Sequence, residues 1–255
     1  MNPYPLQVSA DGHVTTVLLC RPPHNFVDIE ALTALADTLH ALDADEKCRA
    51  IVLGSEGKSF CAGADFSAVP GGGGVLDSEA LYGQAMRLFR TRKPIVAAVQ
   101  GAAIGAGAGL ALVADFRIAC PASRFSVNFN RLGFHPGFGL SCTLPWLVGK
   151  QVAARLFYLG ERLDGERMVQ LGLADELVAD DQVRARAQAL AKEISISAPQ
   201  AVQTTRETLR LGLADEVAAL NARELAIQRP QFAAQDFREG VAAAAARRLP
   251  VFTGR

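Results

Sequence analysis

The order of hydrophobic and polar positions in the first half of the chain is typical of an α/β protein. Short runs rich in alanine or β-branched residues end in glycine, serine or charged residues, which predicts buried strands. Between them lie longer segments whose apolar residues recur three and four positions apart, which predicts amphipathic helices. The expected strands are 14–20, 50–54, 95–100, 116–119 and, with a weaker pattern, 124–127. The expected helices are 28–42, 77–91 and 106–113.

The pattern changes near residue 196. From there to about Pro230, apolar residues keep helical spacing and charged residues fill the positions between them. Because proline ends or kinks a helix, we expect this segment to stop near Pro230 and a further helix to cover about 233–247. We therefore divide the chain into a core over residues 1–195 and a helical C-terminal region over residues 196–255.

An almost uncharged stretch, VQGAAIGAGAGLALVAD at residues 99–115, carries the first chemical signal. Counted from Ile95 it approaches the length of a membrane span, but it consists mostly of alanine and glycine and contains Gln100. We therefore expect no membrane helix here. A dinucleotide-binding loop needs the order GxGxxG and an acid about twenty residues later. The glycines here are evenly spaced and Asp115 comes too soon, which argues against that motif.

The remaining interpretation divides the stretch into a buried strand and a helix that begins near residue 106. The first N–H groups of a helix have no partner within it, and the helix dipole makes that end positive. Glycine and alanine leave this backbone open to a ligand, so the segment can hold an oxyanion. A second small-residue turn, CAGAD at residues 61–65, follows the expected strand 50–54 and offers the second donor that an oxyanion hole needs.

These segments and their order resemble the crotonase superfamily, also called the enoyl-CoA hydratase/isomerase family. The resemblance extends over nearly the whole chain and rests on several motifs in a fixed order. They are LLCRPPHNFVDIEALTALADTL, GKSFCAGAD, KPIVAAVQGAAIGAGAGLALVADFRIA, FNRLGFHPGFGLSCTLPWLVG, LGLADELV and QDFREGVAAAAARRLPVFTG. The resemblance implies an α/β fold built as a spiral of ββα units, with a helical oligomerisation region at its C-terminal end. It also implies a homotrimer or a dimer of trimers.

A substrate and a site are implied by the same resemblance. The substrate is an acyl-CoA thioester, so that coenzyme A is part of the substrate, and no separate cofactor and no metal are expected. By motif, the backbone N–H groups of Ala64 and Ala106 bind the thioester oxygen. The residues expected to line the substrate are His24, Phe26, Cys61, Gly63, Asp65, Phe66, Gly105, Phe129, Phe138, Arg248 and Phe252.

The two glutamates that act as acid and base in hydratases of the superfamily have no counterpart in this chain. Alignment of the motifs without gaps puts Gly109 and Phe129 at their positions, and neither can transfer a proton. Asp115 is the only acid in residues 101–160, and we interpret it as structural because buried acids are normally paired. An imidazole can act as a base near neutral pH, so His135 is the candidate base, the alternative being a turn histidine bonded to the backbone.

Other polar side chains near these positions have a weaker claim to a role in catalysis. If Phe129 continues the strand that ends near residue 127, Asn128 and Asn130 point away from the site. Ser141 and Cys142 have no base beside them in the sequence, which argues against a nucleophile.

Composition narrows the expected partners and compartment. The 26 basic and 26 acidic residues cancel, and no long basic run occurs, which argues against nucleic acid or an anionic membrane as a partner. The five cysteines form no CxxC pair, which argues against a disulfide framework or a zinc site and favours the cytoplasm. The apolar run at 14–20 is short, β-branched and not preceded by a basic segment, so we expect a strand and not a signal peptide.

These observations predict an enzyme, a lyase or isomerase of the superfamily, that stabilises the enolate of an acyl-CoA thioester. Its reaction stays open among hydration or isomerisation, decarboxylation and hydrolysis, because the glutamate pair is missing. One alternative is a subunit that binds acyl-CoA without catalysis. Another is a β-diketone hydrolase that does not need CoA, and fold alone does not choose among them.

Overall fold

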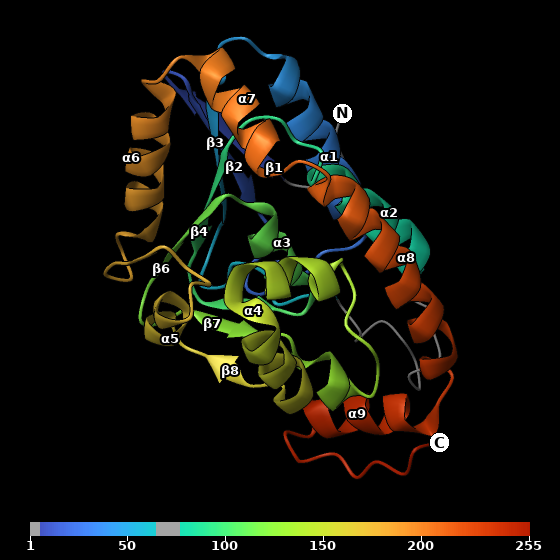
Figure 1. Cartoon of the computed structure of the whole chain (residues 1–255). Coiled ribbons are helices and arrows are strands. Elements are labelled where there is room, and N and C mark those ends of the chain that lie inside the picture. The colour runs from blue at the N-terminus through green and yellow to red at the C-terminus, as the bar shows by residue number, and fades with distance from the viewer. Residues whose placement is uncertain (1–5, 65–76) are drawn as a thin grey trace.

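The computed structural model describes residues 6–64 and 77–255 and shows two β-sheets enclosed by helices (Figure 1). The larger sheet has its strands in the order β1-β2-β3-β4-β6-β9. Its neighbouring strands are parallel except β1 and β2, which form an antiparallel pair. The strands are β1 (Leu6–Asp11), β2 (Val14–Leu19), β3 (Ala50–Ser55), β4 (Ile95–Val99), β6 (Phe116–Ala119) and β9 (Glu176–Leu177).

A smaller sheet lies beside it and contains part of the glycine-rich stretch. Its strands are β5 (Ala102–Ile104), β7 (Arg124–Ser126) and β8 (Arg162–Leu163). β5 pairs with β7 in parallel, and β7 pairs with β8 in antiparallel orientation. Only Gln100 and Gly101 separate β4 from β5, so the chain passes directly from the larger sheet to the smaller one.

Helices cover both sheets and form the C-terminal part of the chain. α7 and α8 run along one side of the molecule, where α8 packs against α2 and α4, and α9 lies near the C-terminus (Figure 1). The helices are α1 (Ile29–Ala44), α2 (Ser78–Leu88), α3 (Ala106–Val113), the 3-10 helix η2 (Asn128–Leu132), α4 (Leu140–Leu159), α5 (Gly165–Gln170), α6 (Val183–Ser195), α7 (Pro199–Leu209), α8 (Leu213–Gln231) and α9 (Gln235–Ala245).

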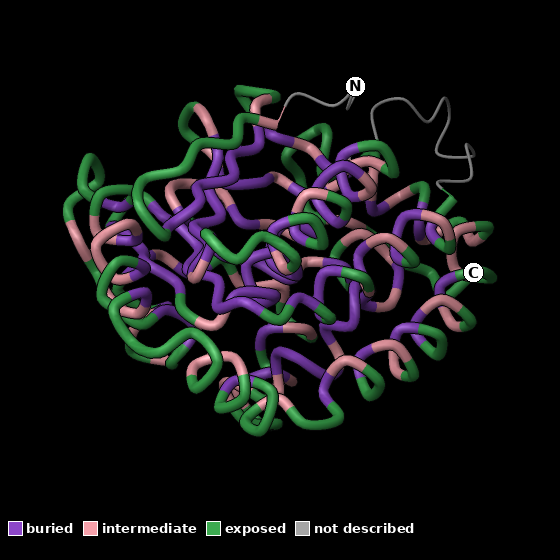
Figure 2. The backbone as a smooth tube through the Cα atoms, turned by 90° about the horizontal axis from the view of Figure 1, so that it is seen from above, coloured by how far each residue is buried: buried purple, intermediate pink, exposed green. Residues whose placement is uncertain are grey.

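The inner strands β2, β3 and β4 of the larger sheet are buried on both faces, which explains why their sequences are nearly continuously hydrophobic. Along β3, Ala50 and Val52 pack with the cluster that contains residues of α6. Ile51 and Leu53 point to the other face and join the main core with α1, α2 and α3. Figure 2 shows the resulting layer of buried backbone through the centre of the molecule, with exposed turns of helix around it.

The strands and helices expected in the first half of the chain are present. α3 and β6 have the expected bounds, and the other expected elements differ from their expected limits by a few residues. The pattern does not predict β1, α5 or α6, nor the very short strands β8 and β9. β8 and β9 have two residues each, which is too short for a two-residue periodicity to be read.

Two expectations are wrong in detail. Phe129 does not continue a strand but lies in η2, so the alternation argument does not apply to its neighbours. The segment expected to run from 196 to about Pro230 is two helices, α7 and α8, separated at residues 210–212. Gly212 has a left-handed φ of +79°, a conformation that interrupts a helix. Pro230 does not end the segment where expected but lies inside the last turn of α8.

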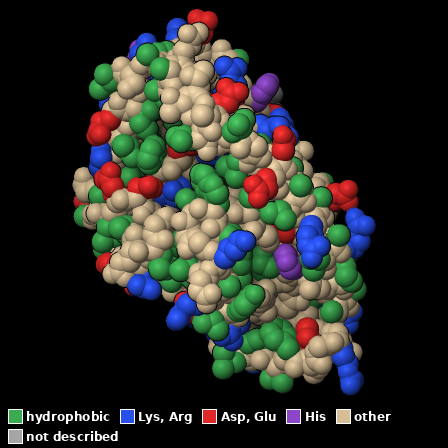
Figure 3. Space-filling model, viewed as in Figure 1, with side chains coloured by type: hydrophobic (Ala, Val, Ile, Leu, Met, Phe, Trp, Pro, Cys, Tyr) green, Lys and Arg blue, Asp and Glu red, His purple; other side chains and the backbone are tan. Residues whose placement is uncertain are grey.

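Charges are distributed without a dominant sign. On the face seen in Figure 3, acidic and basic side chains are interspersed with hydrophobic ones. Among the helices of residues 6–64 and 77–255, none is both long enough and apolar enough to cross a membrane.

Candidate active site

The two small-residue segments meet at the start of α3. Cys61 pairs with β5 through an isolated parallel bridge to Ala103. The Cys61 N–H donates to the Ala102 carbonyl at 2.8 Å, and the Ile104 N–H donates to the Cys61 carbonyl at 3.0 Å. These hydrogen bonds fix the first segment directly beside the strand that leads into α3.

Glycine allows this close approach. Gly63 has a φ of +103°, and a Cβ atom on it would lie 2.9 Å from the Ile104 carbonyl oxygen and 3.8 Å from the Ala106 nitrogen. On the other side of the contact, a Cβ atom on Gly107 would collide with the Cys61 carbonyl. The residue after Gly63 and the first residue of α3 are therefore next to each other, although more than 40 positions separate them.

The N–H groups of Ala64 and Ala106 are free to bind a ligand. Ala64 forms a parallel bridge with Val27, in which the Val27 N–H donates to the Gly63 carbonyl at 2.9 Å. Ala106 is the first residue of α3, where an N–H has no partner within the helix. Within the described part of the chain, neither of these two N–H groups donates to a protein acceptor.

Two phenylalanine rings border the first turn of α3. A Cβ atom on Gly109 would lie 2.5 Å from Cδ1 of Phe138, so the Phe138 ring occupies the space of a side chain at position 109. A Cβ atom on Gly105 would lie 3.8 Å from Cζ of Phe129. Both rings are buried. This edge of the site is therefore apolar and offers no group that transfers a proton.

The opening loop completes the surroundings of Ala64. His24 is exposed and its ring lies 5.0 Å from that of Phe26, while its carbonyl accepts a hydrogen bond from the Ala62 N–H at 2.9 Å. Asn25 is buried and left-handed, with a φ of +49°, and its amide donates to the carbonyls of Glu56 and Ser59. This asparagine holds the loop against the first segment.

The Cys61 side chain is unsuited to nucleophilic chemistry. It is fully buried, and desolvation raises the pKa of its thiol to about 12. The thiol is therefore protonated at neutral pH, and the residue contributes to the site through its backbone.

His135 lies in the turn before α4 and is tied to α8. Its N–H donates to Gln231, its carbonyl accepts from Gln228 Nε2, and its Nδ1 lies 2.8 Å from the Pro136 carbonyl. These are the contacts of a turn histidine. No hydrogen bond among the described residues joins it to Ala64 or Ala106, and its role as a base stays a prediction.

Two other expected site residues, Arg248 and Phe252, lie apart from this junction (Figure 1). Arg248 follows α9 and forms two hydrogen bonds with Glu239, of 2.5 and 2.7 Å. Phe252 is exposed near the C-terminus. Their contact with a substrate stays a prediction, and Asp65 and Phe66 lie outside the described residues.

Comparison with known proteins assigns the family. A model of the enoyl-CoA hydratase/isomerase family matches residues 9–255. The chain belongs to the enoyl-CoA hydratase/isomerase family. It is 37% identical to the probable enoyl-CoA hydratase EchA14 of Mycobacterium tuberculosis over 91% of this chain and 95% of that protein. It is 32% identical to the 1,2-epoxyphenylacetyl-CoA isomerase of Escherichia coli over 95% of each chain.

Solved structures agree with this assignment. The crystal structure of an enoyl-CoA hydratase/isomerase from Pseudoalteromonas atlantica superposes with a TM-score of 0.87 at 31% identity, covering 97% of this chain and 99% of that one. The predicted crotonase-like α/β fold is therefore confirmed.

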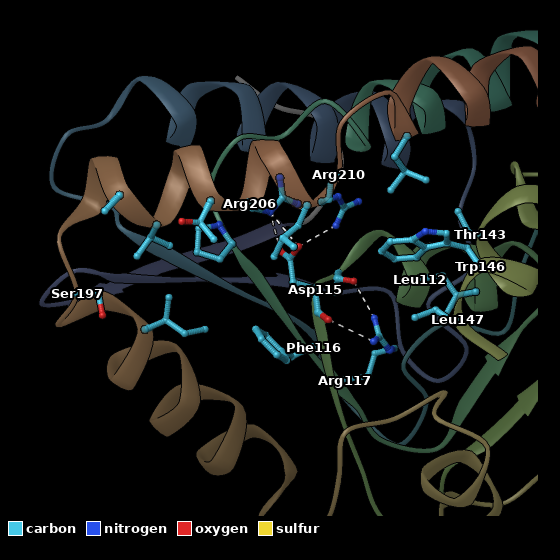
Figure 4. Close-up of a pocket in the computed structure, with 18 residues that line it drawn as sticks. Leu112, Asp115, Phe116, Arg117, Thr143, Trp146, Leu147, Ser197, Arg206 and Arg210 are labelled. Atoms are coloured by element: carbon cyan, nitrogen blue, oxygen red, sulfur yellow. Dashed lines mark hydrogen bonds and ion pairs between the residues drawn. The ribbon is translucent and has the colours of Figure 1, made fainter. Parts of the chain in front are cut away.

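A separate cavity in this family member lies at the other end of α3 (Figure 4). It has a volume of about 530 Å³ and is bordered by α4, α6 and α7. At its floor Asp115 accepts hydrogen bonds from Arg206, Arg210 and the Ile95 N–H, all between 2.8 and 2.9 Å. These contacts are those of a structural acid that joins β4 to α7.

Sequence reasoning missed a buried polar cluster behind Phe138. Glu224 of α8 accepts hydrogen bonds from the Gly139 and Ser141 N–H groups, at 2.7 and 2.8 Å. Burial raises the pKa of the Glu224 carboxyl to about 7. The available signal was the helical spacing of Glu224 from Leu213 and Val217, which places this glutamate on the same face of α8 as buried apolar residues.

Proposed function

We propose that the protein is an enzyme that binds an acyl-CoA thioester and stabilises the enolate of its acyl group between the N–H groups of Ala64 and Ala106. The observation that carries this proposal is the junction at which Gly63 and Gly107 bring these two unpaired N–H groups side by side. The family relatives named as acting on CoA thioesters support the choice of substrate.

The chemistry follows from where the charge develops. The carbonyl oxygen of a thioester gains negative charge when the neighbouring carbon loses a proton or carbon dioxide. It also gains negative charge when a nucleophile adds to the acyl group. Two fixed N–H donors stabilise that oxygen without reorganising, and removal of one such donor typically costs about 3 kcal/mol. The buried rings of Phe129 and Phe138 lower the local dielectric constant and strengthen these hydrogen bonds.

The reaction is a lyase or isomerase reaction of the family that does not use the glutamate pair. Gly109 and Phe129, at the positions assigned to those glutamates, cannot move a proton. Hydration or isomerisation therefore needs another acid or base, for which His135 is the candidate. Decarboxylation, in which the departing carbon dioxide leaves the electron pair of the enolate, needs no base on the protein.

Mass spectrometry of a mixed panel of acyl-CoA thioesters tests this proposal. The panel holds enoyl-, malonyl-type and saturated acyl-CoA, each incubated with the purified protein. Added water, lost carbon dioxide or released CoA would support an enzyme and identify its reaction, and chromatography would reveal isomers of equal mass. An unchanged panel with acyl-CoA retained on the protein would support the binding subunit, which the apolar edge of the site favours as the second candidate.

We propose further that the chain forms a homotrimer or a dimer of trimers. The apolar residues around the cavity of Figure 4 support an interface, since Trp146 and Leu209 on its border are 60% and 73% exposed. Light scattering after size exclusion measures the assembly directly, and a monomer at micromolar concentration would contradict the proposal.

A further inference from the structure

We propose that Phe138 determines which acyl groups the site accepts and that Glu224 is the positioning residue that holds its ring in place. This inference rests on the proposed binding of an acyl-CoA thioester at Ala64 and Ala106. It assigns selection next to the thioester to a residue outside both oxyanion segments.

The place of the Phe138 ring relative to the oxyanion hole follows from helix geometry. The Cα–Cβ bond of a helical residue is tilted toward the N-terminus, so a side chain at 109 would lie over the first turn of α3. The Phe138 ring fills that space, at 2.5 Å from the Cβ position of Gly109. Ala106, whose N–H is proposed to hold the thioester oxygen, belongs to that same first turn. The ring is therefore directed at the carbon atoms next to the thioester carbonyl.

The backbone at Phe138 is held in an unfavourable conformation. Its φ is +65°, in the left-handed region that is unfavourable for a residue with a Cβ atom, and Gly139 follows with a φ of +69°. Such a conformation persists only where the surroundings impose it. Here Phe138 is fully buried and lies edge-on to Tyr82, with ring centroids 6.1 Å apart.

Glu224 supplies the contacts that fix this turn. Its two carboxylate oxygens accept the N–H groups of Gly139 and Ser141, which are otherwise unpaired groups at the start of α4. A carboxylate at a helix N-terminus is also favoured by the helix dipole. Among the described residues, Glu224 has no cationic partner, and its partners are these two N–H groups and the Ser141 hydroxyl. All three belong to the turn that follows Phe138, so the position of Phe138 depends on them.

Glu224 belongs to a larger buried contact between α8 and this turn. Gln228, one helical turn later, donates to the His135 carbonyl, and a Cβ atom on Gly137 would lie 2.6 Å from its Nε2 and 2.5 Å from the Tyr82 hydroxyl. Residues 135–141 are thus fixed from α8 at both ends. The ring of Phe138 lies between the fixed ends and is fully buried.

The proposal predicts discrimination against acyl groups that are branched at the carbon next to the thioester. The test measures dissociation constants of butyryl-CoA and isobutyryl-CoA at pH 8. We expect the wild-type protein to bind butyryl-CoA at least about tenfold more tightly, the lower range for one group that does not fit an apolar pocket. Phe138→Ala should bring the ratio near one. Phe138→Leu is the milder change, to be used if the alanine variant does not fold, and it should also lower the ratio.

Phe134→Leu is the matched control, because Phe134 is a buried phenylalanine of the same loop that packs on Phe129, Phe232 and Phe237. It should leave the ratio unchanged. A folded Phe138 variant with the wild-type ratio would overturn the inference while leaving the proposed function intact. A wild-type protein that binds neither thioester would instead overturn the proposed function.

Glu224 is tested through its effect on Phe138. Glu224→Gln places an amide NH₂ against one of two N–H donors, so it should lower the butyryl-to-isobutyryl ratio by about threefold or more. In a Phe138→Ala background the same change should have no further effect on the ratio, since the ring is absent. Equal effects in both backgrounds would contradict a positioning role, and Glu207→Gln, which removes an exposed carboxyl of α7, is the control for lost charge.

Discussion

At the scale of single residues, two glycines decide how closely the segments that carry Ala64 and Ala106 approach each other. Gly63 faces the Ile104 carbonyl, and Gly107 faces the Cys61 carbonyl. Both neighbours are backbone atoms, which cannot rotate away as a side chain can. The distance between the N–H groups of Ala64 and Ala106 therefore depends on the absence of two side chains.

Gly107→Ala is predicted to destabilise the protein, whereas Gly83→Ala is predicted to stabilise it. The new methyl group at 107 collides with the Cys61 carbonyl, an overpacking that should lower the free energy of unfolding by about 3 kcal/mol. Gly83 is also inside a helix, but it is exposed and a Cβ atom on it has open space. Alanine there should raise the free energy by about 0.5–1 kcal/mol. Chemical denaturation of both variants measures this, and equal changes would show that the contact at Gly107 is not tight.

The sequence names Ala64 and Ala106 as donors through motifs of the family resemblance, and their role in binding stays a prediction. The structure shows that the two segments that carry them lie side by side. Glu224 could not be predicted as a partner of Gly139, because 85 positions separate them and nothing local to α8 shows which turn it will meet. Likewise, the contact of Phe138 with Gly109 depends on how α4 packs against α3.

At the scale of elements, Asp115 connects the larger sheet to the C-terminal helices. It lies between α3 and β6, and it binds the first N–H of β4 and two arginines of α7 and the turn after it. The side chains of Asp115, Arg206 and Arg210 are 15%, 9% and 10% exposed. Removing the acid would leave two buried guanidinium groups without their counter-charge.

Asp115→Asn should therefore lower the free energy of unfolding by about 3 kcal/mol or more, the usual cost of breaking a buried ion pair. The matched control is Asp215→Asn, which removes an aspartate from an exposed pair with Arg90 and should change stability by less than about 1 kcal/mol. Urea titrations of the two variants measure both values. Similar small effects would mean that the Asp115 cluster does not join α7 to the sheet.

The elements that the sequence predicts well are those with an unbroken local pattern. α3 and the strands β2, β3 and β4 are buried along their whole length, so hydrophobicity and length identify them. The C-terminal helices were predicted as helical, but the break at residues 210–212 was not, because the apolar spacing continues across Gly212 into Leu213. The chain forms η2 where a continuation of β7 was expected, because tertiary packing decides the local structure here. η2 packs against α9, and Phe134, which contacts Phe129, packs on Phe232 and Phe237.

At the scale of the whole molecule, Glu224 links stability to pH. Its pKa is raised by burial from 4.5 to about 7, so the folded state holds the proton more tightly than the unfolded chain does. This contribution to stability is complete below about pH 4.5 and is lost as the pH rises through 7. The titratable groups that face Glu224 are Tyr82 of α2 and Cys142 of α4, and Glu216 lies near Cys142. Burial raises the pKa of Tyr82 and that of Cys142.

Glu224→Gln removes this titration. The stability of the wild-type protein relative to the Gln variant should fall by about 3 kcal/mol between pH 4.5 and 8, because the pKa of Glu224 is about 7 in the folded protein and 4.5 in the unfolded chain. Chemical denaturation of both proteins over this range measures the difference, from which groups common to both cancel. A difference that stays constant with pH would show that Glu224 has the same pKa in the folded and unfolded states.

The central claim is that the Ala64 and Ala106 N–H groups polarise a thioester carbonyl, and infrared spectroscopy of butyryl-CoA labelled with ¹³C at that carbonyl tests it most directly. Ala106→Pro removes one donor at the first position of a helix, where proline is tolerated, and Ala106→Gly keeps the donor. Bound to the wild-type protein and to Ala106→Gly, the carbonyl band should move to lower frequency than in solution. With Ala106→Pro the shift should be largely lost. The same shift in all three proteins, or none in the wild type, would contradict the oxyanion hole.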